Sequence, residues 1–276
     1  MSSNTQDGVS TNAPRCTVIV PNYNNSNFIK SAISSITSQK YPNKQIIVVD
    51  DASQDDSVDT LLRYLDGYDK QNNLDNEGDL YIGKIHNIPI GIVKLYKNGG
   101  PSRARNIGIK LAWDATQIYA NLDSDDYWID GKMEKCIEPF VKFPGIVGAV
   151  YTDYCSMNTK SGLKIQEYKE PFSRERIQER CIVHSGAFFS KEALGLVYDK
   201  DTQQFYDEEM RTAEDWDLWL RISDHRMIYH IPEPLTVARV HNNNSFSMYG
   251  IESWQENWKR IAQKRRKLYE QIHKTN

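Results

Sequence analysis

Cys16-Thr-Val-Ile-Val-Pro21 and Gln45-Ile-Ile-Val-Val-Asp50 are the two stretches of this sequence that decide its fold. Each is a short run rich in β-branched residues, and each stops at a residue that strands disfavour, as is typical of strands buried inside a sheet. The segment between them carries apolar residues at helical spacing, namely Ile29, Ala32, Ile33 and Ile36. A strand, a helix and a second strand in this order predict a βαβ unit with parallel strands.

The same alternation continues through the first half of the chain. Helices are predicted at 57–65, at 101–111 and at 132–143, and strands at 92–96, 117–122 and 146–152. Residues 66–90 are rich in Asp, Asn and Gly and are expected to form an excursion on the surface. After residue 154 we expect a hairpin at 157–167, a loop-rich region up to 190, a helix at 214–223, a strand at 227–231 and a long helix at 252–274. The predicted fold class is α/β, with a mostly parallel central sheet, helices on both faces and a C-terminal helix.

Composition limits the class of protein. The chain has 276 residues, of which 39% are hydrophobic and 26% charged, which is ordinary for a globular protein near the upper size for one core. A net charge of −3 gives no polycationic surface for a nucleic acid partner. No apolar run approaches the ~18 residues that span a bilayer, and the first residues lack a signal-peptide pattern. Four scattered cysteines suit reduced thiols, so we expect a cytoplasmic protein.

Polar side chains follow three of the predicted strands at the point where each strand ends. They are Tyr23 and Asn24, then Asp50 and Asp51, then Asp123, Asp125 and Asp126. In an open α/β sheet this edge is where ligands bind. Any one group could be a turn or a helix cap, because Asp, Asn and Ser are favoured there for local reasons. Three groups at one edge predict a ligand site.

The run Asp123-Ser-Asp-Asp126 is the sharpest of these features. Three carboxylates within four residues repel one another unless a cation compensates them. Oxygen ligands suit a hard divalent ion, Mg²⁺ or Mn²⁺, which usually completes its shell with substrate phosphates. The alternative is a solvated acidic turn.

A nucleotide would have to be held here without the usual glycine loops. The first strand is followed by Pro-Asn-Tyr-Asn-Asn instead of GxGxxG, and no Gly-Lys pair is followed by Ser or Thr. Gly99-Gly-Pro-Ser-Arg-Ala-Arg-Asn106 offers another grip, with glycines for close backbone approach, a helix start with free N–H groups and two arginines. This pattern predicts an anion site, and the alternative is an arginine-bearing surface helix.

Six segments in order resemble the inverting glycosyltransferase family 2, whose members have the GT-A fold. The resemblance covers about residues 16–246. It is carried by Val20-Pro-Asn-Tyr-Asn24, Val49-Asp-Asp-Ala-Ser53, Arg103-Ala-Arg-Asn106, Leu122-Asp-Ser-Asp-Asp126, Ala213-Glu-Asp-Trp-Asp-Leu-Trp-Leu-Arg221 and Arg239-Val-His-Asn-Asn-Asn-Ser245. The resemblance implies an enzyme that takes a sugar from a nucleotide-diphosphate sugar, with UDP the expected nucleotide. The acceptor would be a saccharide or glycoconjugate, and the cofactor Mn²⁺ or Mg²⁺.

The resemblance also implies roles for individual residues. The nucleotide and donor sugar would contact Pro21, Tyr23, Asn24, Asp51, Arg103, Arg105, Asn106, Asp123 and Ser124. The metal ligands would be Asp125, Asp126 and His241, although His241 is isolated among asparagines and no spacing marks it. The catalytic base would be Asp215, with Glu214 as the second candidate. The sugar or acceptor pocket would include Ser185, Gly186, Trp216 and Trp219.

A single in-line displacement needs these groups for separate reasons. The departing nucleoside diphosphate gains negative charge, which a divalent ion neutralises as a Lewis acid, so no proton donor is needed there. The attacking hydroxyl needs a base on the opposite face of the sugar. Asp215 suits that role because it begins an apparently amphipathic helix. The alternative for Asp215 is an ordinary first-turn acid that the helix dipole favours.

The expected organisation is a disordered tail at 1–15, a GT-A domain at 16–250 and a basic amphipathic helix at 251–276. Within the domain, 16–126 would be the nucleotide-binding half and 127–250 the acceptor-binding half. We expect the aromatic side of the C-terminal helix to pack on the domain, and the alternative is peripheral contact of its basic side with an anionic membrane. Two other functions stay open, a sugar-nucleotidyltransferase and a catalytically silent nucleotide-sugar binding protein. The oligomeric state is also open.

Overall fold

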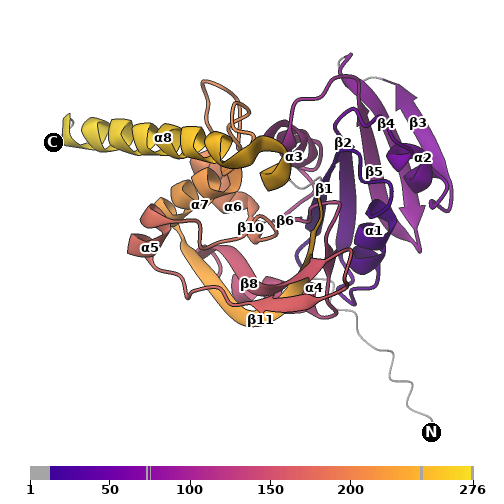
Figure 1. Ribbon diagram of the computed structural model, residues 1–276, viewed down its shortest axis with the longest axis horizontal. Helices are drawn as coiled ribbons and strands as arrows, with labels where there is room; N and C mark the ends of the chain where they lie inside the picture. The colour runs from indigo at the N-terminus through magenta and orange to yellow at the C-terminus, as the bar shows by residue number, and fades with distance from the viewer. Residues whose placement is uncertain (1–12, 73, 75, 243–244, 275–276) are drawn as a thin grey trace, which may run out of the picture.

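The two β-branched runs near the start of the chain form the centre of a large sheet (Figure 1). The computed structural model describes residues 13–72, 74, 76–242 and 245–274. β1 (Cys16–Asn22) pairs in parallel with β2 (Lys44–Asp50) and β6 (Ile118–Asn121), and β2 pairs in parallel with β5 (Ile88–Leu95). The mostly parallel centre confirms the predicted fold class. The predicted disordered tail at 1–15 lies outside the described residues as far as residue 12.

Both faces of the central sheet are apolar because helices cover both. Val18 and Val20 of β1 pack on one face with α1 (Ile29–Thr37), α2 (Ser57–Leu62) and α4 (Lys132–Lys142). Ile19 points to the other face, where α3 (Pro101–Leu111), α6 (Lys191–Val197) and α7 (Glu214–His225) pack. Alternate residues of a strand point to opposite faces, so burial on both sides explains the unbroken apolar run.

The second half of the chain extends the sheet with mixed pairing. β10 (Phe188–Ser190) lies antiparallel between β6 and β8 (Val147–Asn158), and β11 (Met227–Val240) runs parallel to β8. β9 (Lys164–Glu167) forms the predicted hairpin with β8. β7 (Tyr127–Trp128) follows the acidic run directly and pairs antiparallel with β11. This last pairing brings the end of β11 to the acidic run.

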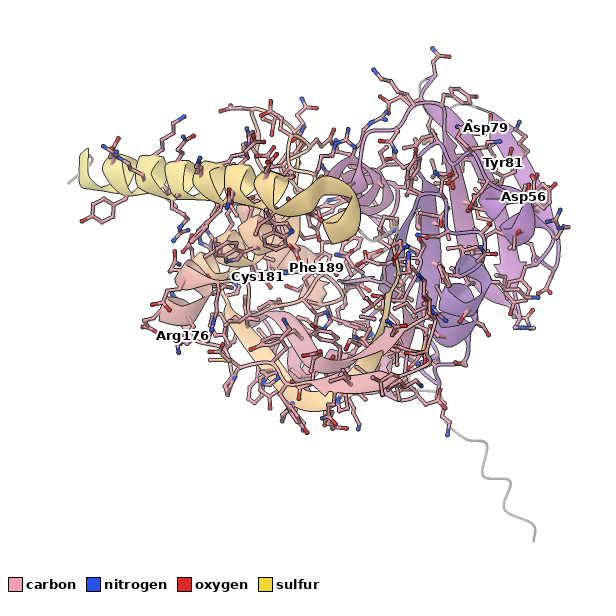
Figure 2. All side chains as sticks on the ribbon, in the orientation of Figure 1. Asp56, Asp79, Tyr81, Arg176, Cys181 and Phe189 are labelled. Atoms are coloured by element: carbon pink, nitrogen blue, oxygen red, sulfur yellow. The ribbon has the colours of Figure 1, made fainter. Side chains whose placement is uncertain are left out.

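Residues 66–90 were expected to be a surface excursion, and the structure corrects this. They contain β3 (Tyr68–Asn72) and β4 (Gly78–Ile85), which pair antiparallel with each other and extend the sheet beyond β5. Figure 2 shows Asp79 and Tyr81 on this outer hairpin. The strands were hidden because polar residues alternate with apolar ones on an edge that faces solvent. Two short helices, α5 (Arg174–Glu179) and α6, were also not predicted.

The C-terminal helix α8 (Ser245–Lys274) changes direction at Gly250, whose φ is 66°, and leaves the body as a long rod (Figure 1). Ile261 is buried in the core that α7 shares, and Trp254 packs against that core, but Trp258 is 54% exposed. The aromatic side of α8 therefore packs on the domain only in part. The basic side is not simply solvated. Arg260 and Lys264 pair with Asp207 at 2.7 and 2.6 Å. Among the described residues, none of the helices combines the length and apolar character needed to span a bilayer.

Candidate active site

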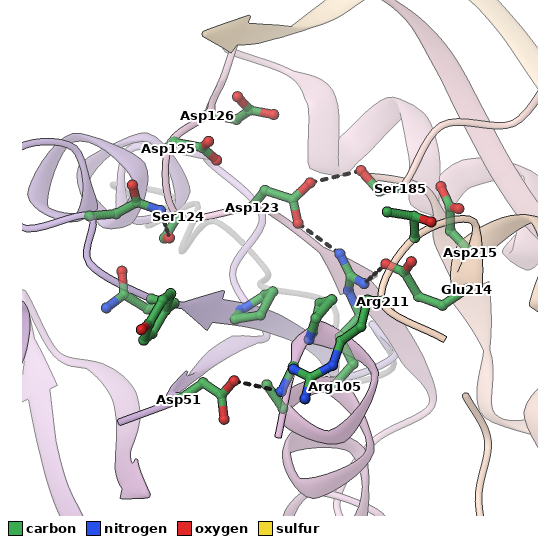
Figure 3. Close-up of a pocket in the computed structure, with 18 of the residues that line it drawn as sticks. Asp51, Arg105, Asp123, Ser124, Asp125, Asp126, Ser185, Arg211, Glu214 and Asp215 are labelled. Carbon is green, nitrogen blue, oxygen red and sulfur yellow. Dashed lines mark hydrogen bonds and ion pairs between the residues drawn. The ribbon is translucent and has the colours of Figure 1, made fainter. Parts of the chain in front are cut away.

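A pocket of about 330 Å³ opens where the central parallel strands end (Figure 3). Asn22, Asp51 and Asp123 line it from the ends of β1, β2 and β6. The start of α3, the start of α7 and the end of β11 complete its lining. The polar groups that follow three separate strands in the sequence therefore meet at one hollow.

The backbone around this pocket is strained at several turns. Asn24, Ala52 and Ala213 have φ of 53°, 63° and 58°, in the left-handed region that costs a residue with a Cβ roughly 1 kcal/mol or more. Ala52 follows Asp51, and Ala213 precedes Glu214 at the start of α7. The turns therefore hold the polar residues in fixed directions.

Asp51 binds the glycines that were expected to bind an anion. Its carboxylate accepts the N–H groups of Gly99 at 2.8 Å and Gly100 at 2.7 Å. Burial raises the pKa of Asp51, and these two donors oppose the rise. Two of the N–H groups expected to bind an anion, those of Gly99 and Gly100 just before α3, are thus paired within the chain. Pro21 and the exposed Tyr23 also line the pocket.

Arg105 joins two acidic parts of the pocket. Its buried guanidinium donates to Asp123 Oδ1 at 2.8 Å and to Glu214 Oε1. The hydroxyl of Ser185 donates to the other oxygen of Asp123 at 2.8 Å. Figure 3 shows this chain of contacts from Ser185 through Asp123 to Glu214. A buried cation between two carboxylates fixes the end of β6 to the start of α7, so its charge is already largely compensated.

Three residues predicted to contact the donor are not brought to the pocket. Among the described residues that line it, Arg103, Asn106 and Asn24 are missing. Arg103 pairs with Glu77 at 3.1 Å and donates to the Lys97 carbonyl oxygen at 3.0 Å. Asn106 is buried, and its side chain bonds to the backbone of Phe205 and Tyr206.

Asn24 links two turns instead of facing a ligand. Its side-chain oxygen accepts the N–H of Gln54 at 2.8 Å, which joins the turn after β1 to the turn after β2. The neighbouring Asn25 does line the pocket, and its amide donates to the hydroxyl of Ser124 at 2.8 Å. Ser124 is therefore held in the lining by a contact across the sheet edge.

Asp125 and His241 form the candidate metal site. His241 Nε2 lies 3.0 Å from Asp125 Oδ2, although 116 residues separate them in the chain. A carboxylate oxygen and an imidazole nitrogen are ligands that Mn²⁺ accepts. Within the part of the chain that the structure describes, no three His, Cys, Asp or Glu side chains gather as a metal cluster. Two protein ligands fit a divalent ion that takes its remaining ligands from phosphate and water.

Asp126, the third predicted metal ligand, has a different environment. Its Oδ1 accepts the backbone N–H of Arg239 at 2.9 Å, while the Arg239 guanidinium donates to the Asp125 carbonyl oxygen at 2.7 Å. Burial and the neighbouring carboxylates raise the pKa of Asp126 well above its ordinary value. These contacts fasten β11 to the acidic run and so position His241, two residues further on. Arg239 stands in one of the motifs that carry the resemblance, but no role was predicted for it.

Glu214 and Asp215 differ in what they can do. Glu214 is buried against Arg105, whereas Asp215 is partly buried in the pocket lining, where one oxygen accepts the N–H of Trp216 at 2.8 Å. Burial and the neighbouring Glu214 raise the pKa of Asp215 to about 7, and Arg105 opposes the rise. A carboxyl that titrates near neutral pH is suited to accept a proton. Of the two, Asp215 has the properties of a base.

Trp216 and Trp219 were predicted in a sugar pocket, and the structure corrects this. Both are buried in the core, Trp219 beside Phe189 of β10 and Trp216 beside α5, where its indole donates to the Ile177 carbonyl oxygen at 2.6 Å. Residues three apart share one helix face, and here that face is the core side. Ser185 does line the pocket, and Gly186 lines a smaller neighbouring hollow.

Arg211 and Trp254 are among the lining residues that the sequence did not predict. Arg211 lines the pocket from the loop before α7, and its guanidinium donates to Asn98 Oδ1 at 3.1 Å. Trp254 reaches the pocket from α8. Asn257 of α8 donates to the Thr212 hydroxyl at 2.9 Å, so α8 is fastened to the loop that leads to Asp215. Arg211 stands three residues before Glu214, and this proximity to a predicted catalytic residue is the one feature of the sequence that could have marked Arg211 as part of the site.

The chain matches a family model described as glycosyl transferase family 2, over residues 17–196. Among curated relatives, an uncharacterized glycosyltransferase of Rickettsia prowazekii is 26% identical over 268 residues, covering 91% of this chain and 73% of the relative.

Two solved structures share the fold. S. aureus TarS 1–349 in complex with UDP-GlcNAc has a TM-score of 0.62 at 19% identity, over 84% of this chain and 60% of that one. The mannosyltransferase PcManGT from Pyrobaculum calidifontis, in complex with GDP-Man and Mn²⁺, has a TM-score of 0.59 at 20% identity, over 86% of this chain and 60% of that one. This chain therefore spans about three-fifths of each.

Proposed function

The chain belongs to glycosyl transferase family 2 and is a glycosyltransferase, and from this premise we propose that it transfers a sugar from a UDP-sugar, with inversion, to a hydroxyl group of a saccharide or glycoconjugate. The observation that carries the proposal is the pocket itself. Asp125 and Asp215 line the same hollow, from the end of β6 and the start of α7. One supplies a ligand for a cation, and the other supplies a base.

The leaving-group side of the reaction belongs to Asp125 and His241. These two residues would hold Mn²⁺ or Mg²⁺, and the ion would neutralise charge on the departing diphosphate as a Lewis acid. Arg239 supports the arrangement because its guanidinium holds the Asp125 backbone and its backbone N–H is held by Asp126. The Mn²⁺ named with PcManGT agrees with this choice of ion.

The acceptor side belongs to Asp215. An incoming hydroxyl loses its proton as the new bond forms, and Asp215 would accept it. Arg105 contributes indirectly, because it holds the neighbouring Glu214 in a buried ion pair at the start of α7. Asp123, held by Arg105 and Ser185, would present fixed oxygens to the donor.

The nucleotide would lie along Pro21, Tyr23 and Asp51. An acidic side chain facing a base suits the N–H of uracil, which favours UDP. The solved neighbours are named with UDP-GlcNAc and GDP-Man, so they support a nucleotide-diphosphate sugar as donor and leave the sugar itself to experiment.

Incubation with a panel of UDP- and GDP-sugars, with Mn²⁺ or with EDTA, tests the proposal. We expect UDP release from one UDP-sugar that requires the metal and falls in Asp215→Asn. Asp114→Asn is the matched control, since Asp114 is exposed and does not line the pocket. When a saccharide acceptor is added to the incubation, proton NMR of the glycoside product should show an anomeric configuration opposite to that of the donor. Donor binding without turnover in the parent protein would instead support a silent binding protein.

A further inference from the structure

A second hollow of about 220 Å³ adjoins the donor pocket. The two share four lining residues, namely Asp123, Asp126, Ser185 and Ala238. The remaining lining of this second hollow comes from Leu122, Tyr154, Lys169, His184, Gly186 and Thr236. Its volume is below the ~300–1,000 Å³ of typical sites for drug-sized ligands, so it suits a single sugar ring.

Lys169 gives the second hollow an unusual charge. Its ammonium lies 5.4 Å from the centre of the Tyr154 ring, and in the described part of the chain it forms no ion pair with a carboxylate. The carboxylates that share the hollow are bonded elsewhere. Asp123 binds Arg105 and Ser185, and Asp126 accepts the N–H of Arg239. The charge of Lys169 therefore remains for a ligand.

The segment that carries Lys169 is firmly held, although it follows the exposed β9 hairpin. The Lys169 backbone N–H donates to Asp153 Oδ1 at 2.9 Å, and the same oxygen lies 2.9 Å from His230 Nε2. Glu170, which follows Lys169, is also held, because its carbonyl oxygen accepts the hydroxyl of Tyr151. Asp153 is buried. Such anchoring orders the segment before any ligand binds. Less conformational entropy is then lost on binding, which favours recognition.

The position of the second hollow suits an acceptor. Ser185 lies on the wall that both hollows share, and it lines the donor pocket together with Asp215 (Figure 3). A sugar stacked on Tyr154 could thus extend a hydroxyl past Ser185 toward the proposed base. An aromatic ring offers a flat apolar surface to a sugar ring, and the Lys169 ammonium, which lies over one face of the Tyr154 ring, selects a negative group.

We propose that the second hollow is the acceptor subsite and that it takes an acidic sugar, whose carboxylate or phosphate binds Lys169 while its ring packs on Tyr154. This inference rests on the proposed function, since it names the acceptor class for the same reaction. It requires no change in how the donor is bound.

Binding of matched sugars tests the inference without turnover. p-Nitrophenyl β-glucuronide and p-nitrophenyl β-glucoside differ only in a carboxylate against a hydroxymethyl group, and the glucoside 6-phosphate adds the phosphate arm. Titrations by NMR in the presence of UDP and the diamagnetic ion Mg²⁺ should give a Kd about tenfold lower for one of the two anionic sugars than for the neutral one. Whichever anion binds more tightly identifies the acidic group. Equal Kd values for all three, or no binding by either anionic sugar, would overturn the inference.

Variants locate the effect. Lys169→Met should abolish the preference and leave the Kd of UDP unchanged, and Lys169→Arg should retain the preference. Lys191→Met is the control, since Lys191 lies over the Trp113 ring at 4.9 Å in a similar contact but outside both hollows. A preference that survives in Lys169→Met would overturn the inference. Failure of the proposed function would give a different result. No donor would then release UDP, regardless of which sugars bind to the protein.

Discussion

Replacement of Asp215 by asparagine removes the proposed base and also removes a carboxyl whose ionisation the fold opposes. Burial and Glu214 raise the pKa of Asp215 to about 7 from the ordinary 3.8. A difference of about three pKa units corresponds to a ceiling of about 4 kcal/mol in the free energy of unfolding. Because the side chain borders a pocket that water can enter, we expect about 1–2 kcal/mol of this to be realised.

The sign of the effect follows from proton binding. Between about pH 4 and pH 7 the folded protein keeps a proton on Asp215 that the unfolded chain has released. The stability that the neutral carboxyl contributes is therefore complete below pH 4 and is lost as the pH rises through 7. Asparagine is neutral at every pH. Asp215→Asn should thus stabilise the protein more at pH 8 than at pH 5.

Thermal unfolding and turnover measure the two consequences together. At pH 8 the Tm of Asp215→Asn should exceed that of the parent by about 3–6 °C, while kcat falls by about 10²–10⁴-fold. Asp114→Asn should change neither. A lower Tm for Asp215→Asn at pH 8, or turnover close to that of the parent, would refute the reasoning that Asp215 is a base held at the expense of stability.

Other consequences involve the pH profile and the core. In the parent protein kcat/KM should fall about tenfold per unit below pH 7, because the base must be ionised, and a profile flat between pH 5 and 8 would contradict this. Arg105→Met should lower the free energy of unfolding by about 3–5 kcal/mol in urea titrations, since it leaves Asp123 and Glu214 without their cation. Trp216→Ala should cost about 3–5 kcal/mol as a core truncation. Trp254→Ala should instead raise KM for the donor with little change in Tm. If Trp254→Ala destabilised the protein as much as Trp216→Ala, the role of Trp254 would be structural only.

The sequence predicted the central strands, the main helices and the edge where the site lies, because periodicity and strand ends are local properties. It could not say which side of α7 faces the core. Trp216 and Trp219 share a helix face with three-residue spacing, and that spacing is the same whether the face meets a ligand or the sheet. The outer strands β3 and β4 were missed because their polar residues resemble a loop.

Charged residues were the hardest to place, because their partners are distant in the chain. Arg103 and Arg105 stand two residues apart, yet one pairs with Glu77 and the other with Asp123 and Glu214. The N–H groups at Gly99 and Gly100 likewise meet Asp51, 48 and 49 residues away. Only tertiary contacts decide whether such a group remains for a ligand. The resemblance, in contrast, named His241, which spacing alone could not mark.

Asp125 and Asp215 line one pocket, and His241 lies 3.0 Å from Asp125. A crystal structure with UDP and Mn²⁺ tests the proposed use of this arrangement most directly. The account predicts one Mn²⁺ bound by the side chains of Asp125 and His241 and by the diphosphate, with the Asp215 carboxylate facing the ion across the pocket. A metal bound without Asp125, or a UDP molecule outside this pocket, would contradict it.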